Sequence, residues 1–163
     1  MTTIRPATPQ DAAAIQAIWL PIIRDTTVTF SSLERSVEDI AAFIADRQER
    51  GREVFVAEQG GTVAGFATYD QFRGGNGYVH AMEHSIVLGP DARGQGMGRA
   101  LMQSVCDHAA AAGAHTMMAG ISGENPSAMA FHAAIGFTQV GRIPESGRKF
   151  GRWIDLVLMQ KIL

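Results

Sequence analysis

The spacing of apolar residues along the chain alternates between helical stripes and short β-prone runs. Residues that can cap a helix precede two of the stripes, Thr8 before the first and Ser36 before the second. A third stripe begins near Met97, and a fourth helix is expected to open at Asn125-Pro126. The β-prone runs predict strands at residues 2–5, 54–58, 62–67, 78–88, 115–121, 137–140 and 153–159. This order predicts an α+β fold with a mixed sheet, in which the central helix connects a parallel pair of strands.

Length and composition predict a single globular domain that spans residues 1–163. Of the residues, 46% are hydrophobic and 18% are charged, which suits one soluble domain with one core. The formal net charge of −2 argues against a general nucleic-acid or membrane-surface binder, because such proteins normally carry a basic stripe. No apolar run approaches the roughly 20 residues of a transmembrane helix, and no signal peptide is visible, so we expect a cytoplasmic location. The single cysteine, Cys106, is expected to be a small buried hydrophobe.

A glycine-rich run, Arg93-Gly94-Gln95-Gly96-Met97-Gly98, follows the apolar run Ser85-Ile86-Val87-Leu88 and precedes the third helical stripe. Backbone N–H groups in the first turn of a helix have no partner within it, and the helix dipole favours a phosphate there. The run does not match the dinucleotide fingerprint, which would need glycine at Arg99 or Leu101, and it lacks the Gly-Lys-Ser/Thr ending of a P-loop. By itself, it fits either an anion-binding loop or a strand-to-helix turn without a ligand.

The pattern R-x-x-G-x-G after a strand resembles the acetyl-CoA-binding loop of the GNAT superfamily of N-acetyltransferases. This resemblance implies a mixed, mostly antiparallel sheet of about seven strands with about four helices, and a V-shaped cofactor cleft between two parallel central strands. It also implies that acetyl-CoA is the co-substrate and that no metal is needed. The positions that match the cofactor site of the family are Ile86, Val87, Leu88, Arg93, Gly94, Gln95, Gly96, Met97, Gly98, Arg99 and Asn125.

A second pattern runs from Asn125 to Phe137 and is similar to the second half of the GNAT signature. Asn125 is also an ordinary N-cap residue, and the resemblance adds a contact between its amide and the pantetheine arm of the cofactor. His132 stands where many relatives have tyrosine. Two roles are open for His132, a general acid for the departing thiolate or a structural histidine beside Phe131.

Acetyl transfer to an amine requires a neutral nucleophile, so a base must remove a proton beside the thioester. Glu83 is the candidate general base, since it lies in the predicted strand that leads to the glycine-rich run. Strand alternation predicts that Glu83 and His84 face opposite sides. With His80, these two residues also match the inverted zinc-protease motif H-x-x-E-H, but that motif needs a helix and this segment predicts a strand.

The C-terminal run from Gly147 to Asp155, with Gln160 further on, is similar to the branch of phosphinothricin and methionine sulfoximine/sulfone N-acetyltransferases. The resemblance extends from Ile4 to Gln160. It implies direct transfer of the acetyl group to the α-amino group of a small amino-acid-like acceptor, without an acyl-enzyme, and it implies a homodimer. Glu83 and His132 match the catalytic positions.

Acceptors of that branch carry a carboxylate, which an arginine or a run of backbone N–H groups can bind. Arg73, followed by two glycines, offers both, and Trp153 is a further candidate for the pocket wall. The candidate acceptor-site residues are Phe30, Arg73, Gly74, Gly75, Tyr78, Glu83, His84 and Ser85. Another amine, such as a polyamine, an aminoglycoside or a protein N-terminus, is the alternative acceptor. A noncatalytic acyl-CoA sensor is the alternative function.

Overall fold

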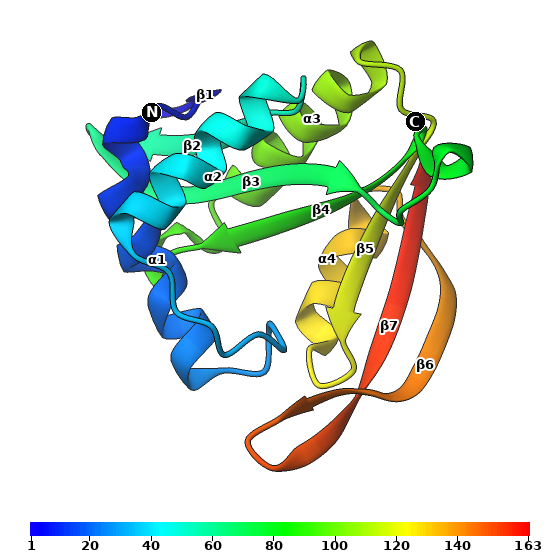
Figure 1. Ribbon diagram of the computed structural model, residues 1–163. Helices are drawn as coiled ribbons and strands as arrows, with labels where there is room; N and C mark the ends of the chain where they lie inside the picture. Colours follow the sequence, from blue (N-terminus) through cyan, green and yellow to red (C-terminus); the bar gives the residue numbers. More distant parts are fainter.

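One seven-stranded sheet runs through the computed structural model, which describes residues 1–163 (Figure 1). The strands are β1 (Thr2–Pro6), β2 (Val54–Gln59), β3 (Thr62–Gln71), β4 (Ala81–Leu88), β5 (Thr116–Ser122), β6 (Thr138–Lys149) and β7 (Arg152–Ile162). The α-helices are α1 (Ala12–Asp25), α2 (Val37–Glu49), α3 (Met97–Ala111) and α4 (Pro126–Ala134). Short 3-10 turns occupy Pro9–Asp11, Asn76–Tyr78 and Pro90–Ala92. None of the helices is both long and apolar enough to span a bilayer.

The strand order in the sheet is β1-β2-β3-β4-β5-β7-β6. Neighbouring strands are antiparallel except β4 and β5, which are parallel and joined through α3. A parallel pair needs a long crossover, and α3 supplies it. The predicted mixed, mostly antiparallel sheet with a parallel central pair is therefore confirmed.

Helices cover both faces of the sheet, α1 and α2 on one face and α3 and α4 on the other (Figure 1). Strand β2 separates two hydrophobic cores, because its alternate residues point to opposite faces. Val54 and Val56 belong to the core under α1 and α2, whereas Phe55 and Ala57 belong to the core under α3. Burial on both faces fixes the register of this part of the sheet, since a shift by one residue would exchange the two sets.

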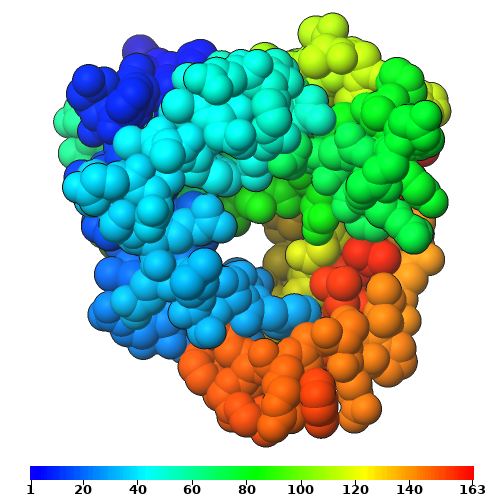
Figure 2. All heavy atoms as spheres, viewed as in Figure 1, coloured from blue at the N-terminus to red at the C-terminus, as the bar shows by residue number.

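The central strands β4 and β5 separate soon after they meet. Their register pairs Ala81–Glu83 only with Thr116–Met118, and beyond these residues the two strands point apart (Figure 1). Ser85 and Gly120 are exposed although both lie within central strands. In Figure 2 an opening passes through the molecule, bordered by β4 (green), β5 (yellow), the α1–α2 segment (light blue) and the β6–β7 hairpin (orange to red). The predicted V-shaped cleft is therefore confirmed.

At the end of the opening farthest from the junction of β4 and β5, the α1–α2 segment contacts the β6–β7 hairpin. The buried ammonium of Lys149 donates hydrogen bonds to the carbonyl oxygens of Ile23 (2.7 Å) and Thr29 (2.8 Å). The ring of Phe30 lies against the backbone of Gly147, where a Cβ atom would collide with it. These contacts join the two halves of the sheet across the cleft.

Several element boundaries differ from those expected from the sequence. β4 begins at Ala81 rather than at residue 78, because the preceding residues form a 3-10 turn. β6 and β7 are longer than expected and form a hairpin that continues to Lys149 and restarts at Arg152. Shifts of register within β6, after Gln139 and after Ile143, interrupt the alternation of side chains that reveals a strand in a sequence. Thr8 precedes a 3-10 turn, and α1 itself begins only at residue 12.

Candidate active site

The glycine-rich loop ends in the N-terminus of α3 with the geometry of an anion-binding turn. Gly94 and Gly96 have φ angles of +74° and +79°, in the left-handed region that favours glycine, and Gly96 is the N-cap residue of the helix. The first hydrogen bond of α3 runs from the N–H of Ala100 to the carbonyl of Gly96 (3.1 Å). The N–H groups of residues 97–99 therefore precede the hydrogen bonds of the helix and can receive a phosphate group.

Contacts of Gln95 and close packing at Gly98 hold the glycine-rich loop in place. The side chain of Gln95 donates to the carbonyl oxygen of Asp91 (2.6 Å) and accepts from Gln59 (3.1 Å). A Cβ atom at Gly98 would lie 3.2 Å from the ring of Phe131 in α4 and 3.3 Å from Leu88 in β4. The lack of a side chain at this position thus lets α3 pack closely on both elements.

The edge of β4 that faces β5 has no strand partner from His84 to Leu88. Ile86, Val87 and Leu88, the predicted cofactor positions of this strand, are half-buried along that edge. At the other side of the cleft, the side-chain oxygen of Asn125 caps α4 by accepting from the N–H of Ala128 (3.2 Å). The capping bond uses the oxygen of Asn125, so its amide nitrogen remains for a ligand, and the two roles expected for this residue involve different atoms.

Glu83 lies where β4 and β5 separate. Its half-buried carboxylate points across to β5, and a Cβ atom at Gly120 would be only 2.8 Å from its Oε1 atom. Burial raises the pKa of the Glu83 carboxyl, and neither a hydrogen bond nor a neighbouring charge offsets this effect. A carboxylate in such surroundings is a stronger base than an exposed one, because the protonated form is favoured by the loss of water.

The carboxylate of Asp70 is the cross-strand neighbour of Glu83 in β3, but it is already neutralised. It accepts hydrogen bonds from Arg47 (2.9 Å), Arg50 (2.8 and 2.9 Å) and Arg52 (3.2 Å). Although burial opposes the shift, hydrogen bonds and the positive charges of Arg47 and Arg50 hold the pKa of Asp70 well below its usual range. Asp70 therefore does not offer a free negative charge to a cationic acceptor.

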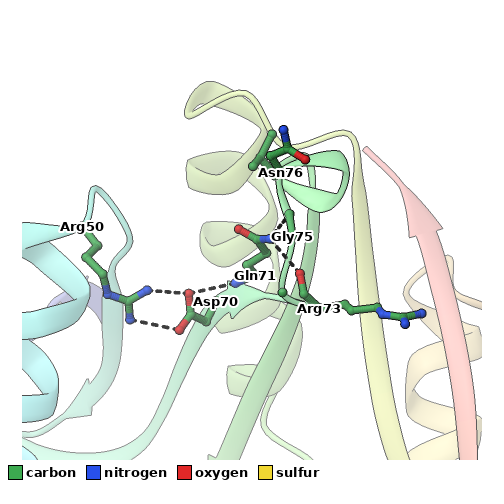
Figure 3. Close-up of a pocket in the computed structure, with 8 residues that line it drawn as sticks. Arg50, Asp70, Gln71, Arg73, Gly75 and Asn76 are labelled. Carbon is green, nitrogen blue, oxygen red and sulfur yellow. Dashed lines mark hydrogen bonds and ion pairs between the residues drawn. The ribbon is translucent and has the colours of Figure 1, made fainter.

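An open depression of about 510 Å³ lies beside Asp70 (Figure 3). The side chain of Gln71 braces its loop by donating to the carbonyl oxygens of Arg73 (2.7 Å) and Gly75 (2.9 Å). The guanidinium of Arg73 extends away from Asp70 and Arg50 toward β5, and it lies 5.2 Å from the ring centroid of Tyr78. It takes part in none of the ion pairs of the protein, so its charge is available to an anionic group.

His84 and His132 form a buried pair on the opposite face of β4 from Glu83. Their Nε2 atoms are 2.9 Å apart, and Nδ1 of His132 lies 2.7 Å from the carbonyl oxygen of Ala128. Nδ1 of His132 must donate to that oxygen, so its Nε2 accepts from a proton on Nε2 of His84, and Nδ1 of His84 is left without a partner. Burial, together with the repulsion that two protonated rings would feel, lowers the pKa of His84 to about 3, and burial also lowers the pKa of His132. Both rings are therefore neutral, and this geometry supports the structural role of His132.

The structure brings together part of the predicted acceptor site. Glu83 and Ser85 lie at the opening, and Arg73, Gly74 and Gly75 lie in the neighbouring loop, with Tyr78 exposed beside them. Phe30 lies on Gly147 at the closed side, as described above. His84 is buried on the other face of β4. Trp153 pairs with Arg148 in the hairpin, and strand alternation places both side chains on the face opposite to that of Lys149, which contacts the α1–α2 segment.

The inverted zinc-protease geometry is absent. His80, Glu83 and His84 lie in or just before a strand, and Nδ1 of His80 is 2.8 Å from the carbonyl oxygen of Gly113. No three His, Cys, Asp or Glu side chains in the structure are arranged to hold a metal ion.

Two residues that shape the site were missed by the sequence interpretation. Lys149, within the C-terminal motif, closes the far side of the opening through partners more than a hundred residues earlier in the chain. Gly120 provides the space that the carboxylate of Glu83 occupies. In the sequence, these two residues appear only as a lysine and a glycine within or beside β-prone runs. That pattern does not show which distant residues they contact.

Comparison with known proteins agrees with this geometry. Residues 4–158 match the family model described as an acetyltransferase (GNAT) domain. An L-methionine sulfoximine/L-methionine sulfone acetyltransferase of Salmonella typhimurium is 35% identical over 158 residues, which cover 97% of this chain and 92% of the relative. A phosphinothricin N-acetyltransferase of Alcaligenes faecalis is 33% identical over 162 residues, covering 99% of this chain and 82% of the relative.

Two solved structures have the same fold. An acetyltransferase from Salmonella typhimurium with its cofactor acetyl-CoA superposes with a TM-score of 0.95 at 35% identity, over 99% of this chain and 94% of the other. A ribosomal-protein-alanine N-acetyltransferase from Brucella melitensis has a TM-score of 0.95 at 36% identity, over 99% of both chains. The resemblance to the phosphinothricin and methionine sulfoximine branch is confirmed by the relatives. The chain belongs to the GNAT family of acetyltransferases.

Proposed function

We propose that the protein transfers the acetyl group of acetyl-CoA to the α-amino group of a small amino-acid-like acceptor, such as methionine sulfoximine, methionine sulfone or phosphinothricin. The observation that carries the proposal is the unpaired, half-buried carboxylate of Glu83, placed at the separation of β4 and β5. The glycine-rich loop lies at one end of this cleft and the free guanidinium of Arg73 at the other. The names of the relatives support the acceptor class.

The donor would be held by backbone groups rather than by side-chain charge. The N–H groups that follow Gly94 would receive its pyrophosphate, with Arg93, Gln95 and Arg99 around them. The pantetheine arm would pair with the free edge of β4 at residues 86–88, and the amide nitrogen of Asn125 would contact it from α4. A backbone N–H near Val87 on the same edge would stabilise the negative charge that develops on the thioester oxygen.

Glu83 would act as the general base. The acceptor arrives as an ammonium ion, and Glu83 accepts one of its protons, directly or through water. The freed nitrogen attacks the thioester carbon, the carbon–sulfur bond breaks, and coenzyme A leaves as a thiolate. A second proton leaves the nitrogen as the amide forms and neutralises the thiolate. The general-acid role, one of the two that the sequence left open for His132, would require its Nε2 to separate from His84, so we assign no step to His132.

The acceptor class follows from the charges around Glu83. Arg73 would bind the acceptor carboxylate, and the backbone N–H groups of Gly74 and Gly75 are available beside it. Asp70 is neutralised by its arginines, which disfavours polycationic acceptors such as polyamines and aminoglycosides. A protein N-terminus beginning with alanine is the second candidate acceptor, because a relative in the same fold at 36% identity is named for it.

The experiment is thiol release from acetyl-CoA with a panel of acceptors. The panel contains methionine sulfoximine, methionine sulfone, phosphinothricin, spermidine, an aminoglycoside and a peptide that begins with alanine. We expect selective turnover of the first three, unchanged by a chelator. If only the peptide is acetylated, the protein is an acetyltransferase with a different acceptor class. If no amine causes thiol release, the result favours a noncatalytic acyl-CoA sensor.

We also propose a homodimer in the cytoplasm. Phe150 and Trp153 are 56% and 58% exposed on the β6–β7 hairpin, with Val140 and Ile143 exposed on β6, and a second copy of the chain would cover such side chains. Light scattering at micromolar concentration should give twice the mass of the chain, and the monomer mass would contradict the dimer.

The lone cysteine supports the proposed cytoplasmic location. Cys106 is free and buried, which fits a reducing compartment.

A further inference from the structure

Gly120 is an unusual residue for the middle of a sheet. It lies in β5, a central strand, yet it is exposed because β4 has already separated from β5 at this level. Its φ angle is outside the left-handed region, so an L-residue could adopt the same backbone. Glycine weakens a strand interior and often marks a close approach of another group. Its presence here therefore needs an explanation other than backbone conformation.

The explanation lies in the space above its Cα atom. A Cβ atom at Gly120 would lie 2.8 Å from Oε1 of Glu83, closer than side-chain carbons approach such atoms, and 3.6 Å from Cδ1 of Leu156, an ordinary contact. The carboxylate of Glu83 thus occupies the volume that any other residue at position 120 would fill. The colliding atom is the end of a flexible side chain, so a methyl group would move the carboxylate rather than disturb the fold.

We infer that Gly120 is a positioning residue for the general base: its missing side chain lets the carboxylate of Glu83 lie against the backbone of β5 at the point where the central strands separate. The inference rests on the proposed function, in which Glu83 accepts the proton of the acceptor. The carboxylate must lie within hydrogen-bond distance of the reacting nitrogen or of a water molecule that bridges to it, and a shift of about 1 Å can cost a factor of about 100 in rate. Gly120 therefore acts through Glu83.

Gly141 provides a matched control. It is also a strand glycine, in β6, with a φ angle outside the left-handed region, and a Cβ atom there would meet nothing within 4 Å. Gly120→Ala and Gly141→Ala thus make the same chemical change, one beside Glu83 and one in open space. Any general effect of alanine in a strand appears in both variants.

The test is a double-mutant cycle with Glu83→Gln, read by kcat, by the KM for acetyl-CoA, by the pH dependence of kcat/KM and by thermal unfolding. We expect Gly120→Ala to lower kcat about tenfold to a hundredfold and to shift the acidic limb of the pH profile, with an unchanged KM for acetyl-CoA and the same small change in melting temperature as Gly141→Ala. Gly141→Ala should match the wild type in kcat, in the KM for acetyl-CoA and in the pH profile. In the Glu83→Gln background, Gly120→Ala should cause no further loss.

A shorter base tests the same geometry without relying on Gly120→Ala alone. Glu83→Asp retracts the carboxylate by one methylene, so adding it to Gly120→Ala should recover part of the lost kcat. Wild-type kinetics and pH profile in Gly120→Ala, or an equal loss in the Glu83→Gln background, would overturn the inference. Wild-type turnover in Glu83→Gln itself would instead overturn the proposed base, so the two failures are distinguishable.

Discussion

The two sides of the cleft around Glu83 are built in different ways. The proposed donor side consists mainly of β4, the glycine-rich loop and the start of α3, which follow one another along the chain within residues 81–111, and Asn125 joins it from α4. The proposed acceptor side combines the loop at Arg73, the backbone at Gly120, the α1–α2 segment and the β6–β7 hairpin. Lys149 reaches residues Ile23 and Thr29 at separations of 126 and 120 positions. Most of the proposed donor side is thus local in the chain, whereas the proposed acceptor side depends on contacts between distant segments.

The choice of acceptor therefore depends on side chains, whereas donor binding depends mainly on the backbone. The proposed donor side relies mainly on a strand edge and on unpaired backbone N–H groups. These groups do not depend on the side chains present, as long as the glycines allow the turn. The proposed acceptor side presents the guanidinium of Arg73 and the half-buried carboxylate of Glu83, and contacts of Phe30 and Lys149 close its outer end. We expect substitutions on the two sides to separate in their effects on the two KM values.

The largest expected effect comes from Glu83→Gln, which lies between the two sides. Loss of a general base typically costs about 10²- to 10⁴-fold in rate, and we expect kcat to fall by that factor. The amide keeps the size of the carboxylate, so the dissociation constant of acetyl-CoA, measured by calorimetry, should stay within about twofold, well under 1 kcal/mol. Equal activity of variant and wild type would remove Glu83 as the base.

On the acceptor side, Arg73→Gln should raise the KM for methionine sulfoximine about tenfold to a hundredfold. A hydrogen bond between charged groups contributes about 1.5–3 kcal/mol, and glutamine cannot replace the guanidinium. Arg148→Gln is the matched control, since Arg148 also stacks on an aromatic ring, that of Trp153, away from the opening. Equal KM values for methionine sulfoximine in the two variants would contradict acceptor binding by Arg73. A changed KM for acetyl-CoA in Arg73→Gln would instead indicate that Arg73 binds the donor.

On the donor side, Gly96→Ala should raise the KM for acetyl-CoA about tenfold, the equivalent of about 1.4 kcal/mol. Its φ of +79° disfavours alanine by roughly 1–2 kcal/mol, and the distorted turn would turn its N–H groups away from the phosphates. Gly113→Ala is the control, because Gly113 has a φ of +97° and equally open surroundings beyond the other end of α3. Chemical denaturation should show similar destabilisation in both variants. A raised KM for acetyl-CoA in Gly113→Ala as well would trace the effect to stability.

An effect on stability, with no change in kinetics at neutral pH, is expected from the buried histidine pair. The pKa of His84 in the folded protein is about 3, below its ordinary value of 6.5, so the unfolded chain binds more protons once the pH falls below 6.5. The free energy of unfolding should therefore decrease as the pH falls from 6.5 toward 3, by up to about 1.4 kcal/mol per pH unit from this group. His84→Gln keeps an N–H donor for His132 and should flatten this decline in urea titrations at several pH values. An identical pH dependence in the variant would contradict the assigned protonation state.

The sequence was sufficient to predict what depends on local pattern. The glycine-rich loop, the parallel central pair and the opposite orientation of Glu83 and His84 follow from periodicity and the motif. His84 was nevertheless expected at the acceptor site, because nothing in the sequence places the ring of His132 against it, 48 positions away. The extent of β6 was hidden by its register shifts, and the contact between Gly120 and Glu83 exists only once β4 and β5 lie side by side. Long-range packing decides these features, and a single sequence does not encode it in a readable pattern.

The most direct measurement is the pH dependence of kcat/KM for methionine sulfoximine in the wild type and in Glu83→Gln. With Glu83 as the base, the wild type should be independent of pH between the raised pKa of Glu83, above its ordinary 4.5, and the pKa of the acceptor amine. In Glu83→Gln only the small neutral fraction of the amine can react, so kcat/KM should rise about tenfold per pH unit over the same range. Parallel profiles in the two proteins would contradict the assignment of Glu83 as the general base.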